Sequence, residues 1–555
     1  MSETNNSYIA ITIGPIGEMM GLVTKPAALW GASYIFSYIS RHLCELIVNK
    51  GVAVCEDIIT PFFPKNEEPE LYKTLLERKD GVGLFHDHII VRASYEKNKE
   101  KMKQIRREVL EDTAKIIYKD KCTDSDTDIL EKYIMIAICG FDKQDSESNA
   151  IMYCGKMLDS LELPKRFSPQ EKVHPILSHF QSDESNWKLK AIAEKFGVNF
   201  DEWQLTFNEN QKERLIRDLP DIAAASHTPL LKKNKYYCVL RSDGDNISKI
   251  IENRKDDGDC REFSRVCLEY CSDVADAVKQ YGGVTIYAGG DDLLALVPCQ
   301  GKKPKIKDVS DAEDNEAEII TVLELTNTIN KIFKTKFNSY IEEIEKENLA
   351  KTKEKDKKPI PTLSYGIFIC YKKFPLYEAL ERSASLLFGV AKNTEEKNCV
   401  AINLQKHSGQ SEEFVISNHA LSDTAPSDRS LIFKVFDSLL SSKSDEDETI
   451  LLSASNKILL FKKLLAAASN NRIYNIFENI FDDEYHLGTR SDFLHKDLPK
   501  IYCEYCVSGL ISLYENDEKV KNADNAKTLA QLIRFMKFFV EKSDETEKYD
   551  NEEGK

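Results

Sequence analysis

The chain has no run of the roughly 18 uninterrupted apolar residues that a helix needs to cross a membrane. Its first residues, MSETNNSYIAITIG, lack the basic stretch and the apolar core of a secretory signal. Its 14 cysteines are scattered along the chain and form no disulfide framework, a pattern typical of reduced thiols in the cytoplasm. We therefore expect a cytoplasmic protein with no membrane anchor.

The chain also lacks an excess of positive charge, because 76 Lys and Arg residues face 92 Asp and Glu residues and give a net charge of −16. Broad, non-specific binding of nucleic acid depends on Lys and Arg neutralising phosphates, so this balance argues against it. It still allows local contact with RNA, and it allows nucleotide binding where a bound metal supplies the positive charge. A length of 555 residues predicts about three or four domains.

The most informative stretch is residues 281–298, YGGVTIYAGGDDLLALVP. Two apolar runs rich in strand-forming residues flank Gly289, Gly290, Asp291 and Asp292, which predicts a strand, a tight turn and a second strand. Mg²⁺ takes oxygen ligands and usually binds between one or two carboxylates and substrate phosphates. Glycine lets a triphosphate come close to the backbone. Taken alone, the motif also fits an ordinary surface hairpin with a polar turn.

A second acidic cluster lies about 40 residues before this hairpin. Residues 235–241 (KYYCVLR) predict a buried strand, which leads into Asp243, Gly244, Asp245 and Asn246. The next residues, ISKII, predict the start of a helix. A strand ending in D-x-D, a helix and an acidic hairpin are the layout of a palm-type nucleotidyl transferase.

In such a site the carboxylates converge on two metal ions, one activating a 3′-hydroxyl and the other stabilising the triphosphate and leaving pyrophosphate. We expect Asp243, Asp291 and Asp292 to be the catalytic residues and the metal ligands. Asp245 and Asn246 are expected to shape a phosphate-binding loop at the helix N-terminus, where backbone N–H groups attract anions.

The pattern of strands and helices predicts an α+β protein with two ferredoxin-like palm domains, a helical region between them and a C-terminal helical bundle. The order β-α-β-β-α-β occurs twice, which indicates an internal duplication. Only the second copy has both acidic clusters, so the first is expected to be degenerate. The expected parts are a first palm (1–165), a helical linker (166–230), a catalytic palm (231–410), a C-terminal helical domain (411–542) and a disordered acidic tail (543–555).

Several local predictions are specific enough to test. In the first palm we expect a helix over 25–50, a strand over 52–63 and a hairpin or strand pair over 81–93. From Glu412 to Glu541 the pattern predicts helices, one of them over 502–513. The Lys- and Glu-rich residues 346–358 are expected to form an exposed loop or a helix extension.

Two further motifs suggest metals on their own. His86-Asp87-His88 resembles part of a metal-dependent phosphohydrolase, but it lies in strand-like sequence with no helical partner, so we expect a structural or RNA-facing role. Cys503 and Cys506 form a C-x-x-C pair, but a structural zinc site needs four ligands, so buried thiols are the preferred interpretation.

A set of short motifs also runs along the chain: Ile13–Ile16, Ala28–Tyr34, Ile222–Ala225, Tyr236–Asn246, Tyr287–Ala295, Ser364–Gly366, Pro375–Leu376, Ala391–Asn393 and Lys406–Gly409. In this order they resemble the large palm-domain subunit of type III CRISPR effector complexes, specifically the Cmr (III-B) branch. The resemblance covers about residues 8–410, and the helical C-terminus is similar to the last domain of that family.

The resemblance implies a subunit that works with guide RNA, target RNA and other Cmr-type subunits. On target recognition such a subunit polymerises ATP into a signalling nucleotide, usually a cyclic oligoadenylate. Carried over to this chain, it implies two Mg²⁺ or Mn²⁺ ions on Asp243, Asp291 and Asp292. The residues that would line the nucleotide are Gly244, Asp245, Asn246, Gly289, Gly290 and, through a phosphate, Lys392.

Two features differ from the family pattern. Many members begin with an HD nuclease domain that cuts single-stranded DNA, whereas the first palm strand of this chain is expected at residue 8, so we expect no DNA cleavage. The cysteine-rich zinc element between the palms has no clear counterpart, because Cys122, Cys139 and Cys154 are widely dispersed, and zinc is therefore doubtful.

Three other functions stay open on the sequence. The same site could join AMP from ATP to S-adenosylmethionine, as some relatives without the HD domain are understood to do. The palms could be a non-catalytic scaffold for RNA and proteins. A diguanylate-cyclase-like enzyme using GTP is the third, although such enzymes prefer Glu at the position of Asp292.

Overall fold

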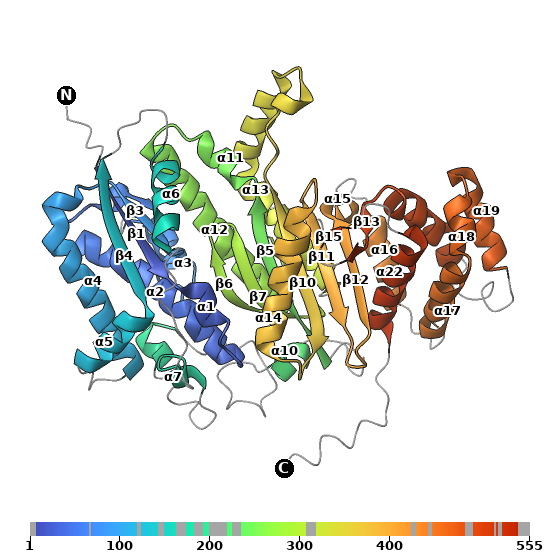
Figure 1. The fold of residues 1–555 in the computed structure, drawn as a ribbon, viewed down its shortest axis with the longest axis horizontal. Helices are drawn as coiled ribbons and strands as arrows, with labels where there is room; N and C mark the ends of the chain where they lie inside the picture. Colours follow the sequence, from blue (N-terminus) through green and yellow to red (C-terminus); the bar gives the residue numbers. More distant parts are fainter. Residues whose placement is uncertain are drawn as a thin grey trace, which may run out of the picture.

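The computed structural model describes residues 7–65, 68–118, 124–142, 149–162, 174–181, 192–198, 219–224, 235–306, 318–422, 429–441, 447–482, 492–515, 518–519 and 524–541. Figure 1 shows three parts side by side along the long axis, namely a first sheet with its helices, a larger second sheet and a group of C-terminal helices. The prediction of an α+β protein with two palms is confirmed.

The first palm has a four-stranded antiparallel sheet in the order β2-β3-β1-β4, connected as β-α-β-β-α-β. Helices α2 and α4 pack on one face of the sheet and α6 on the other. Apolar residues at helical spacing bury α2 along most of its length. The elements are β1 (Ser7–Gly14), α2 (Pro26–Asn49), β2 (Ile58–Thr60), β3 (His88–Val91), α4 (Tyr95–Tyr118), β4 (Met135–Asp142) and α6 (Ala150–Glu162).

Two predictions for this palm are wrong in detail. The hairpin expected over 81–93 is a single short strand, β3, and the strand expected over 52–63 contracts to β2. The residues before β3 form no strand because they pack against the second palm. His86 is half-buried within the first palm, its Nε2 lies 2.9 Å from Thr60 Oγ1, and desolvation lowers its pKa to about 3. His86 is therefore a neutral, structural histidine.

The second palm has a seven-stranded sheet in the order β13-β12-β11-β10-β5-β7-β6. Helices α12 and α13 pack against each other, α12 contacts β6 and β7, and α13 contacts β10. The elements are β5 (Tyr236–Asp245), α11 (Ile247–Glu252), α12 (Asp257–Tyr281), β6 (Val284–Gly289), β7 (Asp292–Pro298), α13 (Val322–Leu349), β10 (Thr362–Tyr371), α14 (Leu376–Ala384), β11 (Cys399–Gln405), β12 (Ser411–Ser417) and β13 (Ile511–Ser512).

Strand β12 corrects the helical prediction that began at Glu412. It pairs antiparallel with β11 along its whole length, so the sheet of the second palm continues past residue 410. Phe414, Val415 and Ile416 of this strand are buried, because β11 lies beside it in the sheet and helix α22 packs against it. In the same palm, helix α14 continues into a π-helical turn over Ser385–Val390.

The two palms are joined by polar contacts at β6, the edge strand that carries the acidic hairpin. The Ala288 amide donates to the Gly83 carbonyl at 3.2 Å, and Ser33 Oγ donates to the Ile286 carbonyl at 3.0 Å. Arg78 bridges the palms as well, binding Asp80 in its own palm and Asp276 on α12 at 2.7 Å. The first palm therefore supports the hairpin from its open edge.

The C-terminal part is helical, as predicted, and docks on the second sheet through α22 and β13. The prediction of a helix over 502–513 is wrong, because a π-helical turn over Tyr502–Cys506 is followed by β13. Cys503 and Cys506 lie on that turn, and burial raises the pKa of both thiols. The main helices are α16 (Leu431–Ser441), α17 (Asp447–Leu460), α18 (Lys462–Ala467), α19 (Asn470–Ile480) and α22 (Asn525–Val540).

Most of the linker expected over 166–230, and the whole tail expected over 543–555, lie outside the described residues. The described linker residues include α7 (Ser178–Gln181) and α10 (Leu219–Ala224). Among the helices that the structure describes, none is long and apolar enough to span a membrane.

Candidate active site

The acidic end of β5 is the first component of the site. Asp243 and Asp245 are separated by one residue, so their side chains lie on the same face of the strand. The strand is longer than predicted and includes both aspartates. Asn246 follows with φ of 60°, a left-handed conformation that Asn tolerates, and α11 then begins. The local structure of this motif is therefore strand, single-residue bend and short helix.

The hairpin is the second component. β6 and β7 pair down to Gly289 and Asp292, which leaves Gly290 and Asp291 as a two-residue turn. Gly290 has φ of 69°, which glycine adopts without strain, and a side chain there would meet open space. Cys271 on α12 lies beneath the turn and its Sγ donates to the Gly290 carbonyl at 3.3 Å.

Gly244 brings the two components together. A Cβ atom at this position would collide with the Asp291 carboxylate and with Ile247. In its absence the Gly244 amide donates to the Asp291 carboxylate. The Asp292 carboxyl group also lies close to that of Asp243, which adds to desolvation in raising the pKa of Asp292. The three predicted catalytic aspartates therefore lie together at one end of the sheet.

The cluster has more negative charge than the surrounding protein neutralises. Burial and the neighbouring Asp243 raise the pKa of Asp291 to about 6. Asp292 keeps an exposed surface, but protein atoms surround its carboxyl closely. This desolvation, together with Asp291 and Asp243, raises its pKa well above the usual value. Such shifts mark candidate functional sites, because an isolated surface hairpin would not produce them.

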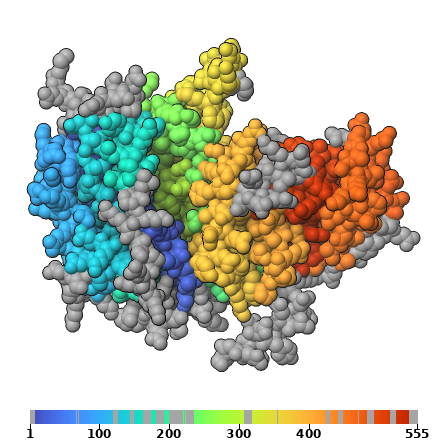
Figure 2. Space-filling view, in the orientation of Figure 1, coloured from blue at the N-terminus to red at the C-terminus, as the bar shows by residue number. Residues whose placement is uncertain are grey.

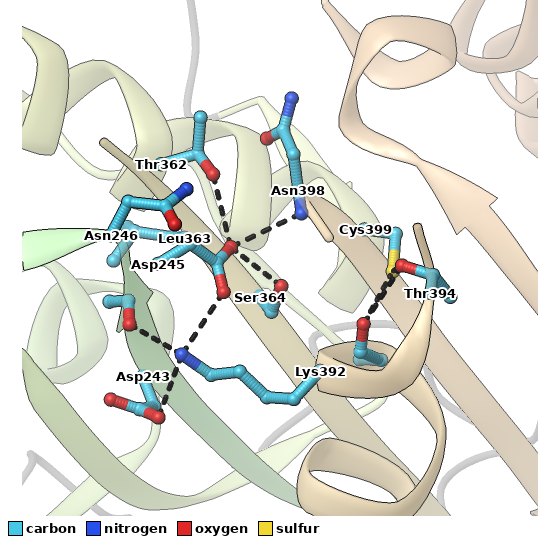
Figure 3. A network of polar contacts seen from close by, with 12 residues as sticks. Asp243, Asp245, Asn246, Thr362, Leu363, Ser364, Lys392, Thr394, Asn398 and Cys399 are labelled. Atoms are coloured by element: carbon cyan, nitrogen blue, oxygen red, sulfur yellow. Dashed lines mark hydrogen bonds and ion pairs between the residues drawn. The ribbon is translucent and has the colours of Figure 1, made fainter. Parts of the chain in front are cut away.

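Lys392 supplies the nearest positive charge (Figure 3). Its Nζ lies 2.8 Å from Asp243 Oδ2 and 3.0 Å from Asp245 Oδ1, and it donates to the Gly244 carbonyl. Burial lowers the pKa of Lys392, but Asp243 and Asp245 outweigh this effect and raise it. Lys392 was expected at a nucleotide phosphate, and here it binds the carboxylates of the acidic strand.

Asp245 has a different environment from the other aspartates. It is fully buried, and its Oδ2 accepts hydrogen bonds from Ser364 Oγ at 2.7 Å, Thr362 Oγ1 at 3.0 Å and the Asn398 amide at 3.1 Å. Figure 3 shows these donors around one carboxylate. Asp245 therefore holds Lys392 in place, and its expected role at a phosphate-binding loop stays a prediction.

Sequence reasoning missed Arg241. It lies two residues before Asp243 on the same face of β5, donates to Ser383 Oγ at 3.1 Å and interacts electrostatically with Asp292. The period of two along the strand, with Arg241, Asp243 and Asp245 in series, could have revealed it. Arg241 and Lys392 are two cations beside the acidic cluster.

The donors in this site suit a divalent cation, although they do not form a complete cage. Among the described residues no three His, Cys, Asp or Glu side chains stand in a metal-holding arrangement. The Lys392 ammonium forms an ion pair with Asp243, and the Asp292 carboxyl group lies close to Asp243 as well. Carboxylate oxygens are nevertheless the ligands that Mg²⁺ and Mn²⁺ prefer, and the raised pKa values show that positive charge is lacking. The donor chemistry therefore fits.

Fold and site define a protein with tandem palm domains, of which the second carries an acidic strand end and an acidic hairpin. The family model described as "Cas10/Cmr2, second palm domain" matches residues 236–401. The model described as "CRISPR-associated protein Cmr2, N-terminal" matches residues 8–119. The chain belongs to the Cas10/Cmr2 family.

One curated relative is the CRISPR system Cmr subunit Cmr2 of Pyrococcus furiosus, which is 28% identical over 222 residues. That match spans 36% of this chain and 22% of the relative. A solved structure of a Csm1–Csm4 cassette in complex with cA4 superimposes with a TM-score of 0.51 at 12% identity. It covers 96% of this chain and 70% of that chain, which supports the fold.

Proposed function

We propose that the second palm is a nucleotidyl transferase that joins adenylates from ATP through 3′–5′ phosphodiester bonds. The product would be a signalling nucleotide such as a cyclic oligoadenylate. The observation that carries this proposal is the convergence of Asp243, Asp291 and Asp292, with raised pKa values for the two hairpin residues. Membership of the Cas10/Cmr2 family supports it.

Asp243, Asp291 and Asp292 would hold two Mg²⁺ or Mn²⁺ ions. When bound, such ions activate an attacking hydroxyl and stabilise the charge on the triphosphate and the leaving group. The carboxylates must be ionised for this, so metal binding displaces any proton that their raised pKa values retain, and it weakens as the pH falls.

Lys392 and the glycines have supporting roles in the proposal. Asp245 keeps the Lys392 ammonium beside Asp243, where it can neutralise a phosphate once the carboxylate is engaged by metal. The open space above Gly290 lets a nucleotide reach the backbone of the turn. Position 289 requires glycine, because a side chain there would collide with the Tyr287 ring. Asn246 holds the strand end by donating to the Ile360 carbonyl at 3.3 Å.

The proposed context is a type III CRISPR effector complex, with guide RNA, target RNA and other Cmr-type subunits as partners. The Pyrococcus relative is named as a Cmr subunit, which supports this context. The similar solved structure is a cassette of two proteins, Csm1 and Csm4, which supports the expectation of a protein partner. The net charge of −16 is consistent with most RNA affinity residing in those partners.

The test is mass spectrometry of products from the assembled complex with target RNA, Mn²⁺ and ATP, with and without S-adenosylmethionine. Adenylate rings or chains formed from ATP alone are the expected result. A product that needs S-adenosylmethionine would instead indicate transfer of AMP to that acceptor. Absence of any product, in a complex shown to bind its target, would leave the second palm a scaffold. A parallel reaction with GTP in place of ATP tests for the guanylate reaction, and we expect no product from it.

A further inference from the structure

Helix α13 extends beyond the body of the second palm and ends in a projecting loop, visible in yellow at the top of Figures 1 and 2. We call residues 349–357 the lysine loop. Its sequence, LAKTKEKDK, has four lysines and two acidic residues, in a chain whose acidic residues outnumber its basic ones. Three of the lysines, Lys353, Lys355 and Lys357, are exposed and Lys351 is half-buried.

The lysine loop is closed by a rigid base. Asn348 and Lys358 exchange two hydrogen bonds, Nδ2 to carbonyl at 2.8 Å and amide to Oδ1 at 2.7 Å. The Lys358 ammonium is fixed by Asn253 Oδ1 at 2.6 Å and by Glu347 at 2.8 Å. This clasp of Asn348 and Lys358 fixes the two ends of the loop, so less backbone entropy is lost when the loop binds a partner.

The base also connects the lysine loop to the acidic strand end. Asn253 ends α11, the helix that follows Asp245 and Asn246. After the clasp, the Ile360 carbonyl accepts from Asn246, and Thr362 and Ser364 donate to Asp245. A ligand on the loop would thus be linked to the candidate active site through one short, continuously hydrogen-bonded segment.

We propose that the lysine loop is a docking element for the phosphodiester backbone of a single-stranded nucleic acid. With four lysines and two acidic residues, the lysine loop carries a net positive charge on an acidic protein. Such a loop attracts a polyanion, and exposed Lys side chains bind phosphates without reading bases. An acidic protein surface is the other possible partner, but the exposed apolar surface of the loop is limited to Leu349, which is 86% exposed, and the small side chain of Ala350. A protein interface would need a buried apolar core, whereas a phosphate strand does not.

The experiment compares two variants of the full chain, each losing four lysines. In the loop variant Lys351, Lys353, Lys355 and Lys357 become Gln. In the control variant four lysines of α4, all exposed, become Gln: Lys97, Lys99, Lys101 and Lys103. Fluorescence anisotropy with a short labelled single-stranded RNA, and with DNA of the same sequence, measures affinity as a function of salt. The readout needs no nucleotide chemistry, so it is independent of the proposed activity.

We expect the loop variant to lose about tenfold or more in affinity at low salt for both strands. Its salt dependence should weaken by about two to three in log–log slope, since each phosphate contact contributes roughly 0.7. The control variant should change about twofold at most. Equal losses in the two variants, unchanged binding by the loop variant, or a loss confined to RNA or to DNA would overturn the proposal.

Discussion

The two palms share a strand order and differ at the two positions that build the site. Strands β2-β3-β1-β4 of the first sheet correspond to β6-β7-β5-β10 of the second. β1 ends at Gly14 with no carboxylate, whereas β5 ends in Asp243-Gly244-Asp245. Residues 61–87 separate β2 from β3, whereas Gly290 and Asp291 alone separate β6 from β7. The fold supplies the frame, and the strand end and the tight turn supply the chemistry.

The long connection of the first palm nevertheless contributes to the site of the second. It contains Arg78, which binds Asp276 on α12, and Gly83, which binds the edge strand β6. The first palm thus has no acidic turn between these two strands, and its long connection supports the turn of its neighbour. Four substitutions test this division, and they follow from the largest expected effect to the smallest.

The double substitution Asp291→Asn/Asp292→Asn removes the acidic turn and makes the second palm like the first. We expect product formation to fall by about 10³-fold or more, because the charge on the reacting phosphates is no longer stabilised. Single-turnover assays of the assembled complex measure this. Glu96→Gln/Glu100→Gln, two exposed carboxylates of α4 in the first palm, should leave the rate unchanged. A comparable loss in both pairs would contradict the account.

Arg78→Met tests the contact between the palms. Arg78 is 10% exposed and pairs with Asp80, which is 9% exposed, so its loss leaves a buried carboxylate without its partner. We expect the free energy of unfolding to fall by about 3 kcal/mol. Chemical denaturation measures it. Arg107→Met breaks an exposed ion pair with Glu111 and should cost less than about 0.5 kcal/mol. Equal costs for the two would show that Arg78 is only a surface group.

Gly244→Ala tests the close approach of the two acidic components. The added methyl group would displace the Asp291 carboxylate or Ile247, at a cost of about 1–3 kcal/mol. We expect activity to fall about tenfold or more while the melting temperature changes by only a few degrees. Gly258→Ala at the start of α12, where the nearest atom lies 3.1 Å away, is a control that should leave activity intact.

Asp291→Asn tests the charge imbalance without metal. The folded-state pKa of Asp291 is raised to about 6, so its ionised form destabilises the fold, and this cost grows as the pH rises from about 4 to 6. In the presence of a metal chelator, we expect the free energy of unfolding of the variant to exceed that of wild type by about 1–2 kcal/mol at pH 7. Near pH 4 we expect no such difference. Denaturation at the two pH values measures this. A variant less stable than wild type at pH 7 would contradict it.

The sequence predicted the acidic site well because its signals are local. An apolar strand leading into Asp243 and glycines beside Asp291 each fix a short stretch of backbone. Arg241 and the bond from Lys392 to Asp243 were missed, since they depend on which residues face each other across the sheet. The roles assigned to these aspartates remain predictions.

The same distinction explains the errors in the fold. β12 was assigned to helices because its seven residues lie in a helix-rich region, and only pairing with β11 makes them a strand. In the first palm, residues 81–87 have strand-like composition but contact β6 of the other palm, so tertiary packing overrides local propensity. The lysine loop was expected as an exposed loop or helix extension, but the clasp of Asn348 and Lys358 was beyond sequence patterns.

We propose that a divalent metal completes the acidic cluster of the second palm. Electron paramagnetic resonance of Mn²⁺ titrated into the full chain tests it most directly. We predict that wild type and Glu96→Gln/Glu100→Gln bind Mn²⁺ alike, and that Asp291→Asn/Asp292→Asn weakens binding by about tenfold or more. Equal Mn²⁺ binding by all three proteins would contradict the claim.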